Sequence, residues 1–259
     1  MKKDVVAGIG EIGKPILKLL SKDNIVVGFD LNHDLMDDKK FERYKILKVS
    51  FLHIAIPATD KFINNILNLY KKFQPECIVI HSTIKPGITE KLQGKLPIPV
   101  IYSATRGVHK SMLKDLKRYT KFFAICSISP RKQWAISSFS KKMKLCGIKT
   151  KKMSKPETLE LAKIICDTSY LGWLVNYAQV SNLIAKNYDV NYDEMWSFSD
   201  EIHKFLGNRP KMYPGYIGGH CVIPNLDLVY SDTLNLIKKM NNKYAKKVKS
   251  AKRIYKKYK

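Results

Sequence analysis

The sequence lacks any uncharged apolar run of about 20 residues, the length that a membrane-spanning helix needs. It also begins without the apolar segment and small-residue cleavage site of a signal peptide, because Met1 is followed almost at once by a strand pattern. Hydrophobic residues make up 45% of 259 residues, which is enough to bury a sizeable core. We therefore expect a globular, cytoplasmic protein.

Cysteines are few and irregularly spaced, and no CxxC pair occurs. This excludes a disulfide framework and argues against a zinc site, so we expect no metal. Most of the cysteines lie in apolar contexts, which predicts small core residues. They are Cys77, Cys126, Cys146, Cys166 and Cys221. Cys221 is considered separately below because glycines precede it.

Acidic residues are scarce: 22 Asp and Glu stand against 47 Lys and Arg, a formal net charge of +25. Such an excess attracts polyanions, although a lysine-rich composition bias explains it equally well. The excess is strongest in residues 238–259, which carry eleven basic residues and no acid. We interpret this segment as a basic C-terminal tail. It is either a solvated helix end or a contact for nucleic acid or an anionic membrane.

The first half alternates short apolar runs with amphipathic stretches. This rhythm is typical of an α/β fold whose parallel sheet is covered on both faces, a Rossmann-type doubly wound sheet. The predicted strands are residues 5–7, 24–30, 51–56, 77–81, 100–103 and 121–128.

No strand pattern follows residue 153. Residues 157–186 have no internal proline and predict one long central helix, and residues 190–205 predict another. We therefore expect a Rossmann domain at 1–153 and a smaller all-α domain at 154–237, which contains a Gly/Pro-rich loop at 213–225. The tail at 238–259 completes the chain.

The turn Gly8-Ile9-Gly10-Glu11-Ile12-Gly13 follows a predicted strand and opens a predicted helix, the context that a GxGxxG motif needs to bind a dinucleotide. The first glycine permits the tight turn, the second lets the pyrophosphate approach, and the third packs helix on strand. Backbone N–H groups at the helix N-terminus favour phosphate. Asp30 ends the next strand, where a carboxylate binds ribose hydroxyls and repels a 2′-phosphate. The motif predicts NAD as cofactor.

Other polar residues follow later strands at the same edge of the sheet. Pro57 and Thr59 follow the third strand, and Ser82 and Thr83 follow the fourth. Because ligands bind beyond the carboxyl ends of parallel strands, these residues are candidates for the cofactor site. A turn or helix-capping role explains the Thr83 hydroxyl equally well.

Two further groups could take part in chemistry. Lys163 and Asp167 are four residues apart on the predicted long helix and therefore share a face. Cys221 follows Gly218, Gly219 and His220, and a thiol becomes a nucleophile where nearby cations lower its pKa. A surface ion pair and an unremarkable loop cysteine are the alternatives.

Four segments together resemble the UDP-glucose/GDP-mannose dehydrogenase family, in particular its members that oxidise UDP-N-acetylhexosamines. The loop YPGYIGGHCVIPN at 213–225 is the most specific. The others are ETLELAK at 157–163 with Asp167, GIGEIGKPI at 8–16 and HSTIKPG at 81–87. The match covers most of residues 1–225. The wider resemblance is to 6-phosphogluconate-dehydrogenase-like folds.

The resemblance implies a catalytic role for four residues. Cys221 would capture an aldehyde as a thiohemiacetal that is oxidised to a thioester, and Lys163 would stabilise the oxyanion. Asp167 would stand where the family has an Asn, and Thr83 would position water or cofactor. The resemblance also implies a homodimer formed through the central helix, although packing within one chain explains the apolar stripe of that helix equally well.

The sequence departs from the family pattern at several positions. Ala104-Thr105 stands in place of Pro-Glu, and Ala178-Gln179 in place of Asn-Glu. The family's further C-terminal domain, which binds the nucleotide, has no counterpart that we expect here. The substrate-binding candidates are the basic residues Arg106 and His109, and Tyr213, Gly218, Gly219 and His220 of the loop.

Three interpretations stay open. The first is a shortened nucleotide-sugar dehydrogenase that uses Cys221. The second is a two-electron dehydrogenase or reductase that uses Lys163 as acid and base. The third is a non-catalytic NAD-binding subunit that needs a partner chain.

Overall fold

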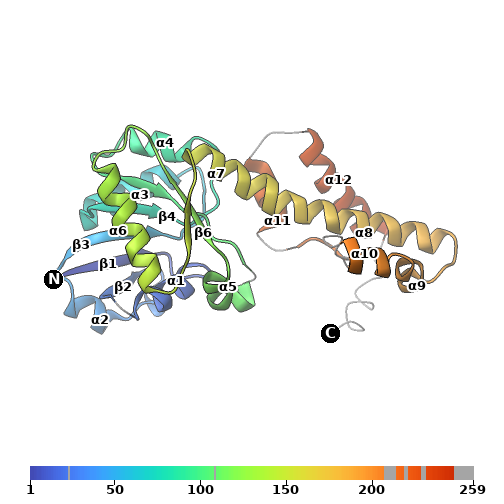
Figure 1. Ribbon diagram of the computed structural model, residues 1–259, viewed down its shortest axis with the longest axis horizontal. Helices are drawn as coiled ribbons and strands as arrows, with labels where there is room; N and C mark the ends of the chain where they lie inside the picture. Colours follow the sequence, from blue (N-terminus) through green and yellow to red (C-terminus); the bar gives the residue numbers. More distant parts are fainter. Residues whose placement is uncertain (23, 108, 207–213, 219–220, 229–231, 248–259) are drawn as a thin grey trace. The chain divides into compact units, whose positions relative to one another are not determined.

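The computed structural model describes residues 1–22, 24–107, 109–206, 214–218, 221–228 and 232–247. The chain divides into two compact units, Met1–Lys163 and Ile164–Lys259 (Figure 1). The loop residues Tyr213, Gly219 and His220, and tail residues 248–259, lie outside the described part.

The first unit is built on a seven-stranded sheet with the order β2-β1-β3-β4-β5-β6-β7. Neighbours from β2 to β5 pair in parallel. The strands are β1 (Lys2–Ala7), β2 (Val26–Phe29), β3 (Lys48–Ile54), β4 (Cys77–Ile80), β5 (Val100–Tyr102), β6 (Lys121–Ile125) and β7 (Thr150–Lys152).

The sheet is mostly parallel, as predicted, but β6 runs antiparallel to β5. The helix between them, α5 (Met112–Arg118), has 7 residues and spans about 10 Å. The chain therefore returns to the sheet with β6 starting beside the end of β5. The 14-residue helix α6 (Lys132–Leu145) follows β6, and β7 pairs in parallel with β6.

Alternating strand residues build a core on each face of the sheet. Val5, Leu52 and Ile78 belong to one buried cluster, and Val6, Phe51 and Val79 belong to the other. Since successive side chains of a strand point to opposite faces, the two clusters cover both sides. The first cluster includes residues of α3 (Phe62–Phe73), α4 (Ile88–Gln93) and α7 (Pro156–Ala162). The second includes residues of α1 (Gly13–Leu20), α5 and α6. The Rossmann-type doubly wound fold is confirmed.

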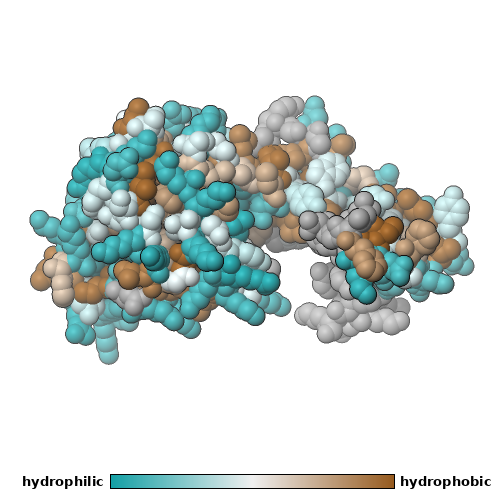
Figure 2. Space-filling view, in the orientation of Figure 1, coloured by the Kyte–Doolittle hydropathy of each residue, from teal (hydrophilic) through white to brown (hydrophobic). Residues whose placement is uncertain are grey.

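Short elements complete the first unit. They are η1 (His33–Leu35), α2 (Asp38–Arg43) and η2 (His109–Ser111). Hydrophilic side chains cover much of this unit on the face shown in Figure 2, as the excess of lysine leads one to expect.

The second unit is helical. The π-helical segment η3 (Lys163–Ser169) leads into α8 (Tyr170–Asn187), which contacts α9, α11 and α12. The hydrophobic core of the second unit is formed by Ile217, Val222, Leu226, Leu234 and Ile237. The remaining elements are α9 (Tyr192–Ser197), α10 (Asp200–Leu206), α11 (Val222–Asn225), η4 (Leu226–Leu228) and α12 (Asp232–Lys247).

The helices differ from the sequence expectation in two places. The segment predicted as one helix at 190–205 forms α9 and α10. The Ser197 hydroxyl donates to the Glu194 carbonyl over 2.7 Å, and serines that bond to the backbone in this way favour helix ends. The long helix predicted at 157–186 is interrupted by the wider π-helical turn of η3.

The domain boundaries also differ from those expected. The first unit ends at Lys163 and not near residue 153, because α7 packs against β5, β6 and α4. The basic segment predicted from residue 238 begins inside α12, where Asn241 and Tyr244 are buried. Residues 238–247 are therefore part of the helical core and not a tail.

Candidate functional site

The glycine turn has the geometry that its sequence predicts. Gly8 has φ 86°, and a Cβ there would lie 2.6 Å from the Ala55 carbonyl oxygen. A Cβ on Gly13 would lie 1.7 Å from the Gly8 carbonyl oxygen, so only glycine lets α1 approach β1 this closely. A Cβ on Gly10 would meet nothing within 4 Å. The middle glycine therefore faces open space, where a pyrophosphate can approach the backbone.

Helix α1 begins directly at this turn. Its N-cap residue, Ile12, makes no side-chain capping hydrogen bond, and the first turn of the helix carries no acid. Glu11, just before it, is exposed. The N-terminus of α1 is thus suited to an anion.

Asp30 lies against the same turn. It follows β2, its Oδ2 accepts the Ile9 N–H over 2.6 Å, and its Oδ1 accepts the Asn32 N–H over 3.0 Å. The carboxylate is therefore held beside the glycine turn, where the motif requires it.

The loops that follow β3 and β4 are joined at this edge. The Ser82 hydroxyl donates to the Ile56 carbonyl over 2.5 Å, next to Pro57. Pro57 and Thr59 are exposed, and Thr83 is half-buried. These four candidate residues all lie beyond the carboxyl ends of parallel strands, on the side of the glycine turn.

Glu160 is a buried acid that the sequence reasoning missed. Its Oε2 accepts the Gly87 N–H over 2.6 Å, and its Oε1 accepts the Thr89 N–H over 3.0 Å and the Thr89 hydroxyl over 2.6 Å. Burial raises its pKa, and these hydrogen bonds counteract that rise. Glu160 thereby fixes α7, which leads to Lys163, onto the start of α4. In the sequence, the position of this acid between Leu159 and Leu161 could have indicated a buried carboxylate.

A buried lysine, Lys121, is a second group that sequence reasoning missed. Its ammonium donates to the Ser103 carbonyl over 3.1 Å, at the carboxyl end of β5. Burial, helped by the charges of Arg106 and Lys163, lowers the pKa of Lys121 to about 7. Lys121, Arg106 and Lys163 therefore form a basic cluster at this edge of the sheet.

Arg106 is anchored within this cluster. Its Nη2 donates to the Thr120 carbonyl over 2.7 Å, and its guanidinium lies 5.0 Å from the Phe122 ring centre. Part of its hydrogen-bonding capacity is thus used within the protein. His109 begins η2, and its side chain lies outside the described part.

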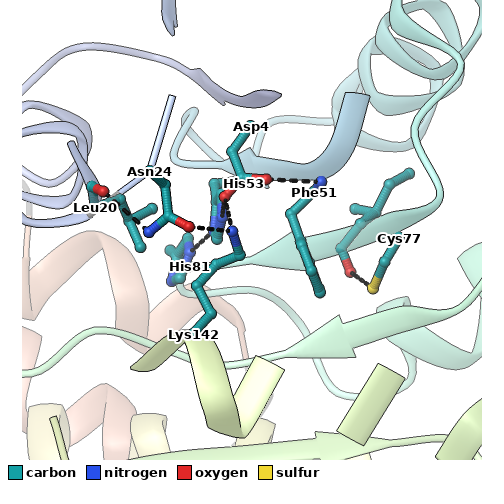
Figure 3. A network of polar contacts seen from close by, with 9 residues as sticks. Asp4, Leu20, Asn24, Phe51, His53, Cys77, His81 and Lys142 are labelled. Carbon is teal, nitrogen blue, oxygen red and sulfur yellow. Dashed lines mark hydrogen bonds and ion pairs between the residues drawn. The ribbon is translucent and has the colours of Figure 1, made fainter. Parts of the chain in front are cut away.

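A chain of polar groups runs within the sheet from His81 through His53 to Asp4 and Lys142 (Figure 3). The Ser103 carbonyl lies 3.1 Å from His81 Nδ1, and His81 Nε2 lies 3.0 Å from His53 Nδ1. Since a carbonyl only accepts, His81 Nδ1 carries the proton. Burial lowers the pKa of both imidazoles.

The chain ends at an ion pair on the face covered by α6. Asp4 Oδ2 lies 3.8 Å from His53 Nε2 and 2.6 Å from the Lys142 ammonium. Burial opposes ionisation of Asp4, but His53 and Lys142 outweigh burial and lower its pKa. The network crosses the sheet away from the glycine turn. It therefore supports the sheet beside the candidate site and is not part of that site.

In the second unit, a polar cluster holds the loop before Cys221. Gln179 Nε2 donates to the Gly215 carbonyl over 2.6 Å and to Asn241 Oδ1 over 3.1 Å. Asn241 also accepts the Ile217 N–H over 2.8 Å and donates to the Ile217 carbonyl over 3.0 Å. Both side chains are buried. Helices α8 and α12 therefore position this loop.

Cys221 is exposed and precedes the first turn of α11. Gly218 is also exposed, and Asp167 is half-buried within η3. Cys77, Cys126 and Cys146 are buried as expected, whereas Cys166 is exposed. Among the described residues, no helix is long and apolar enough to cross a membrane. The same residues contain no cluster of three or more His, Cys, Asp or Glu side chains suited to a metal ion.

No protein-family model and no curated protein matches this sequence. Solved structures do. The native UDP-N-acetyl-mannosamine dehydrogenase Cap5O from Staphylococcus aureus is 18% identical with a TM-score of 0.72, over 100% of this chain and 72% of that one. The UDP-D-ManNAc dehydrogenase from Pyrococcus horikoshii is 18% identical with a TM-score of 0.71, over 93% and 68%. This chain has the UDP-N-acetylmannosamine dehydrogenase fold.

The same fold extends to a shorter enzyme. The Mycobacterium tuberculosis 3-hydroxyisobutyrate dehydrogenase is 12% identical with a TM-score of 0.68, over 95% of this chain and 94% of that one. The nucleotide-sugar dehydrogenase fold and this shorter fold thus have the Rossmann and helical units in common.

The positions that depart from the family pattern lie in structured places. Ala104 and Thr105 follow β5 and are buried, and the Thr105 N–H donates to the His81 carbonyl over 3.3 Å. Ala178 is buried in α8, beside the Gln179 that holds the loop. Neither departure supplies an acid in place of the Glu that the resemblance leads one to expect.

Proposed function

We propose that this chain is an NAD-dependent dehydrogenase that oxidises an alcohol carbon of a nucleotide sugar. One observation carries the proposal. The turn from Gly8 to Gly13 is closely packed at both end glycines, open at Gly10, and bordered by the Asp30 carboxylate. That combination suits a dinucleotide better than an empty structural turn, because a turn that only joined strand to helix would have no need of the open middle glycine.

The residues present fit NAD. Gly8, Gly10 and Gly13, with the backbone of Glu11 and Ile12, would hold the pyrophosphate. Asp30 would hold the adenosine ribose and repel the phosphate of NADP. Pro57, Thr59, Ser82 and Thr83 would line the nicotinamide end. Bound NAD would supply the hydride acceptor for the oxidation.

The chemistry follows from four side chains in this proposal. The Cys221 thiolate adds to the carbon of the aldehyde and forms a thiohemiacetal. Loss of a hydride from that carbon gives a thioester, and water then releases the acid and the thiol. The Lys163 ammonium stabilises the oxyanion at each addition, and Asp167 orients Lys163. Thr83 positions the water or the cofactor.

Substrate contacts are proposed for two groups of residues. Arg106 and His109 would bind phosphate or carboxylate groups. Tyr213, Gly218, Gly219 and His220 would surround the sugar. These segments follow one another along the chain in the same order as in the family that the sequence resembles.

We also propose a homodimer formed through α8. Tyr170, Tyr177 and Ile184 recur every seven residues and are 53%, 66% and 49% exposed. Heptad spacing of exposed apolar residues is typical of helices that pair.

The test begins with calorimetric titration of the protein with NAD, NADH and NADP, with and without UDP-N-acetylmannosamine. We expect NAD to bind more tightly than NADP, and Asp30→Ala to remove the preference. Turnover should yield two NADH per substrate. Cys221→Ala and Lys163→Ala should each abolish acid formation, whereas Cys166→Ala, the matched exposed cysteine, should not.

Unchanged turnover in both variants would refute the mechanism. One NADH per substrate would assign a two-electron dehydrogenase that leaves Cys221 idle. Absence of dinucleotide binding would refute the proposed function as a whole.

A further inference from the structure

A cavity lies at the opposite edge of the sheet from the glycine turn. It has a volume of about 550 Å³. Lys3 at the start of β1 and Lys48 at the start of β3 line it, whereas the glycine turn follows the end of β1. In Figure 1 this edge is the one marked by the N-terminus. The volume is within the range of small-molecule sites.

Basic side chains outnumber acidic ones in the lining of this cavity, and the Lys45 ammonium also pairs with Glu42 over 3.2 Å. Four lysines, Lys3, Lys45, Lys48 and Lys72, line it together with one acid, Glu76. The Lys3 ammonium is buried and donates to the Tyr44 and Lys45 carbonyls over 2.7 and 3.0 Å. Burial lowers the pKa of Lys3. An anion in the cavity would offset the mutual repulsion of these ammonium groups.

One wall of the cavity is aromatic. Phe41 and Phe73 line it with ring centres 6.4 Å apart, and Phe29 packs behind them, 5.2 Å from Phe73. The Lys72 ammonium lies 4.0 Å from the centre of the Phe29 ring. Half-buried rings next to cations suit a ligand that has both a planar ring and a negative charge.

Glu76 supplies an unused acceptor at the same place. Its Oε1 binds the Lys2 ammonium over 2.6 Å, but its Oε2 is buried and has no hydrogen-bond partner within the described residues. Buried polar atoms are nearly always paired, so this oxygen is suited to an N–H or O–H of a ligand.

We propose that this cavity binds a small aromatic anion of the mononucleotide class. Its phosphate contacts Lys45 and Lys48, its planar ring packs against Phe41 and Phe73, and a hydroxyl or amino group donates to Glu76 Oε2. This site is separate from the glycine turn and does not depend on the proposed dehydrogenase activity.

The test is calorimetric titration of the full chain with AMP and with UMP, each with and without saturating NADH. We expect saturable binding that NADH leaves unchanged. Lys45→Gln/Lys48→Gln should weaken it about tenfold or more. The control Lys141→Gln/Lys144→Gln removes the same charge from exposed positions on α6 and should change it less than about twofold. Thermal unfolding of each variant verifies that it is folded.

A third variant, Phe41→Leu, keeps all four lysines and removes one ring. It should weaken AMP binding and leave the binding of inorganic phosphate unchanged. Equal weakening by both lysine pairs would attribute binding to overall charge and overturn the proposal. Displacement of AMP by NADH would place it in the glycine turn, with the same consequence. Absence of saturable binding of AMP and UMP to the wild-type chain would also overturn the proposal.

Discussion

At the scale of single residues, Gly10 and Gly13 of one turn have opposite surroundings. A Cβ on Gly13 would lie 1.7 Å from the Gly8 carbonyl oxygen, whereas a Cβ on Gly10 would meet nothing within 4 Å. Gly13→Ala should therefore destabilise the fold by more than about 3 kcal/mol. Gly10→Ala should change stability by less than about 0.5 kcal/mol but weaken NAD binding about tenfold or more.

Urea unfolding and calorimetry measure the two effects separately. A stable Gly13→Ala variant would contradict the packing role of this glycine. A Gly10→Ala variant that binds NAD normally would contradict the position of the pyrophosphate.

Lys121 makes stability depend on pH. Its pKa is lowered to about 7 in the folded chain, so the unfolded chain binds a proton that the folded chain lacks between pH 7 and its ordinary pKa of 10.5. Stability should therefore rise with pH above 7, by about 1 kcal/mol per pH unit. The buried thiols Cys77 and Cys126, with raised pKa values, oppose this only near and above pH 9.

The measurement is urea unfolding at pH 7.0 and pH 8.5 for the wild-type chain and for Lys121→Met. In the variant, the free energy of unfolding should no longer rise with pH in this range. Ser103 should keep its contact with His81. An equal slope in both proteins would show that Lys121 does not titrate in this window.

At the scale of elements, the loop at 214–218 depends on two helices that contact it through Gln179 and Asn241. Asn241→Leu removes both hydrogen bonds to Ile217, at a cost of about 1 to 2 kcal/mol of local stability. Amide hydrogen exchange at Ile217 should become about tenfold faster or more. Asn187→Leu, at the exposed end of α8, should leave it unchanged. Unchanged exchange in Asn241→Leu would mean that other contacts hold the loop.

Elements with a strong local pattern could be predicted, and those that depend on tertiary contacts could not. The buried strands β1 to β6 and the glycine turn follow from apolar runs and glycine spacing. The antiparallel direction of β6 is a property of its pairing with β5, which no strand pattern encodes. The edge strand β7, whose residues are Thr150, Lys151 and Lys152, has no apolar residue to reveal it.

The candidate site divides in the same way. The glycine turn and Asp30 combine residue type with local spacing and could be found in the sequence. Glu160, Lys121 and Asn241 matter through partners 18 to 73 residues away, so nothing nearby marks them. Asn241 was hidden further by the lysines around it, which suggested a tail where the chain forms a packed helix.

At the scale of the whole molecule, the exposed apolar residues of α8 predict self-association. Sedimentation equilibrium should find a dimer, and Ile184→Glu should raise its dissociation constant about tenfold or more, because a charge would then be buried at the interface. The matched control is Ile128→Glu, which alters an exposed isoleucine of the first unit. A wild-type chain that stays monomeric at micromolar concentration would contradict the proposed dimer, as would equal weakening by both variants.

The π-helical segment at Lys163–Ser169 has a consequence for how this protein tolerates changes in length. A π turn holds one residue more than the α turn it replaces, and such turns arise within α-helices frequently at functional sites. Loss of a single residue here would convert this wider turn to a regular α turn. Loss of one residue in the middle of α8 would instead rotate Asn176 away from Gln179. Loss of one residue of this segment after Asp167 should therefore lower the free energy of unfolding less than loss of one residue in the middle of α8, and it leaves the spacing of Lys163 and Asp167 unchanged.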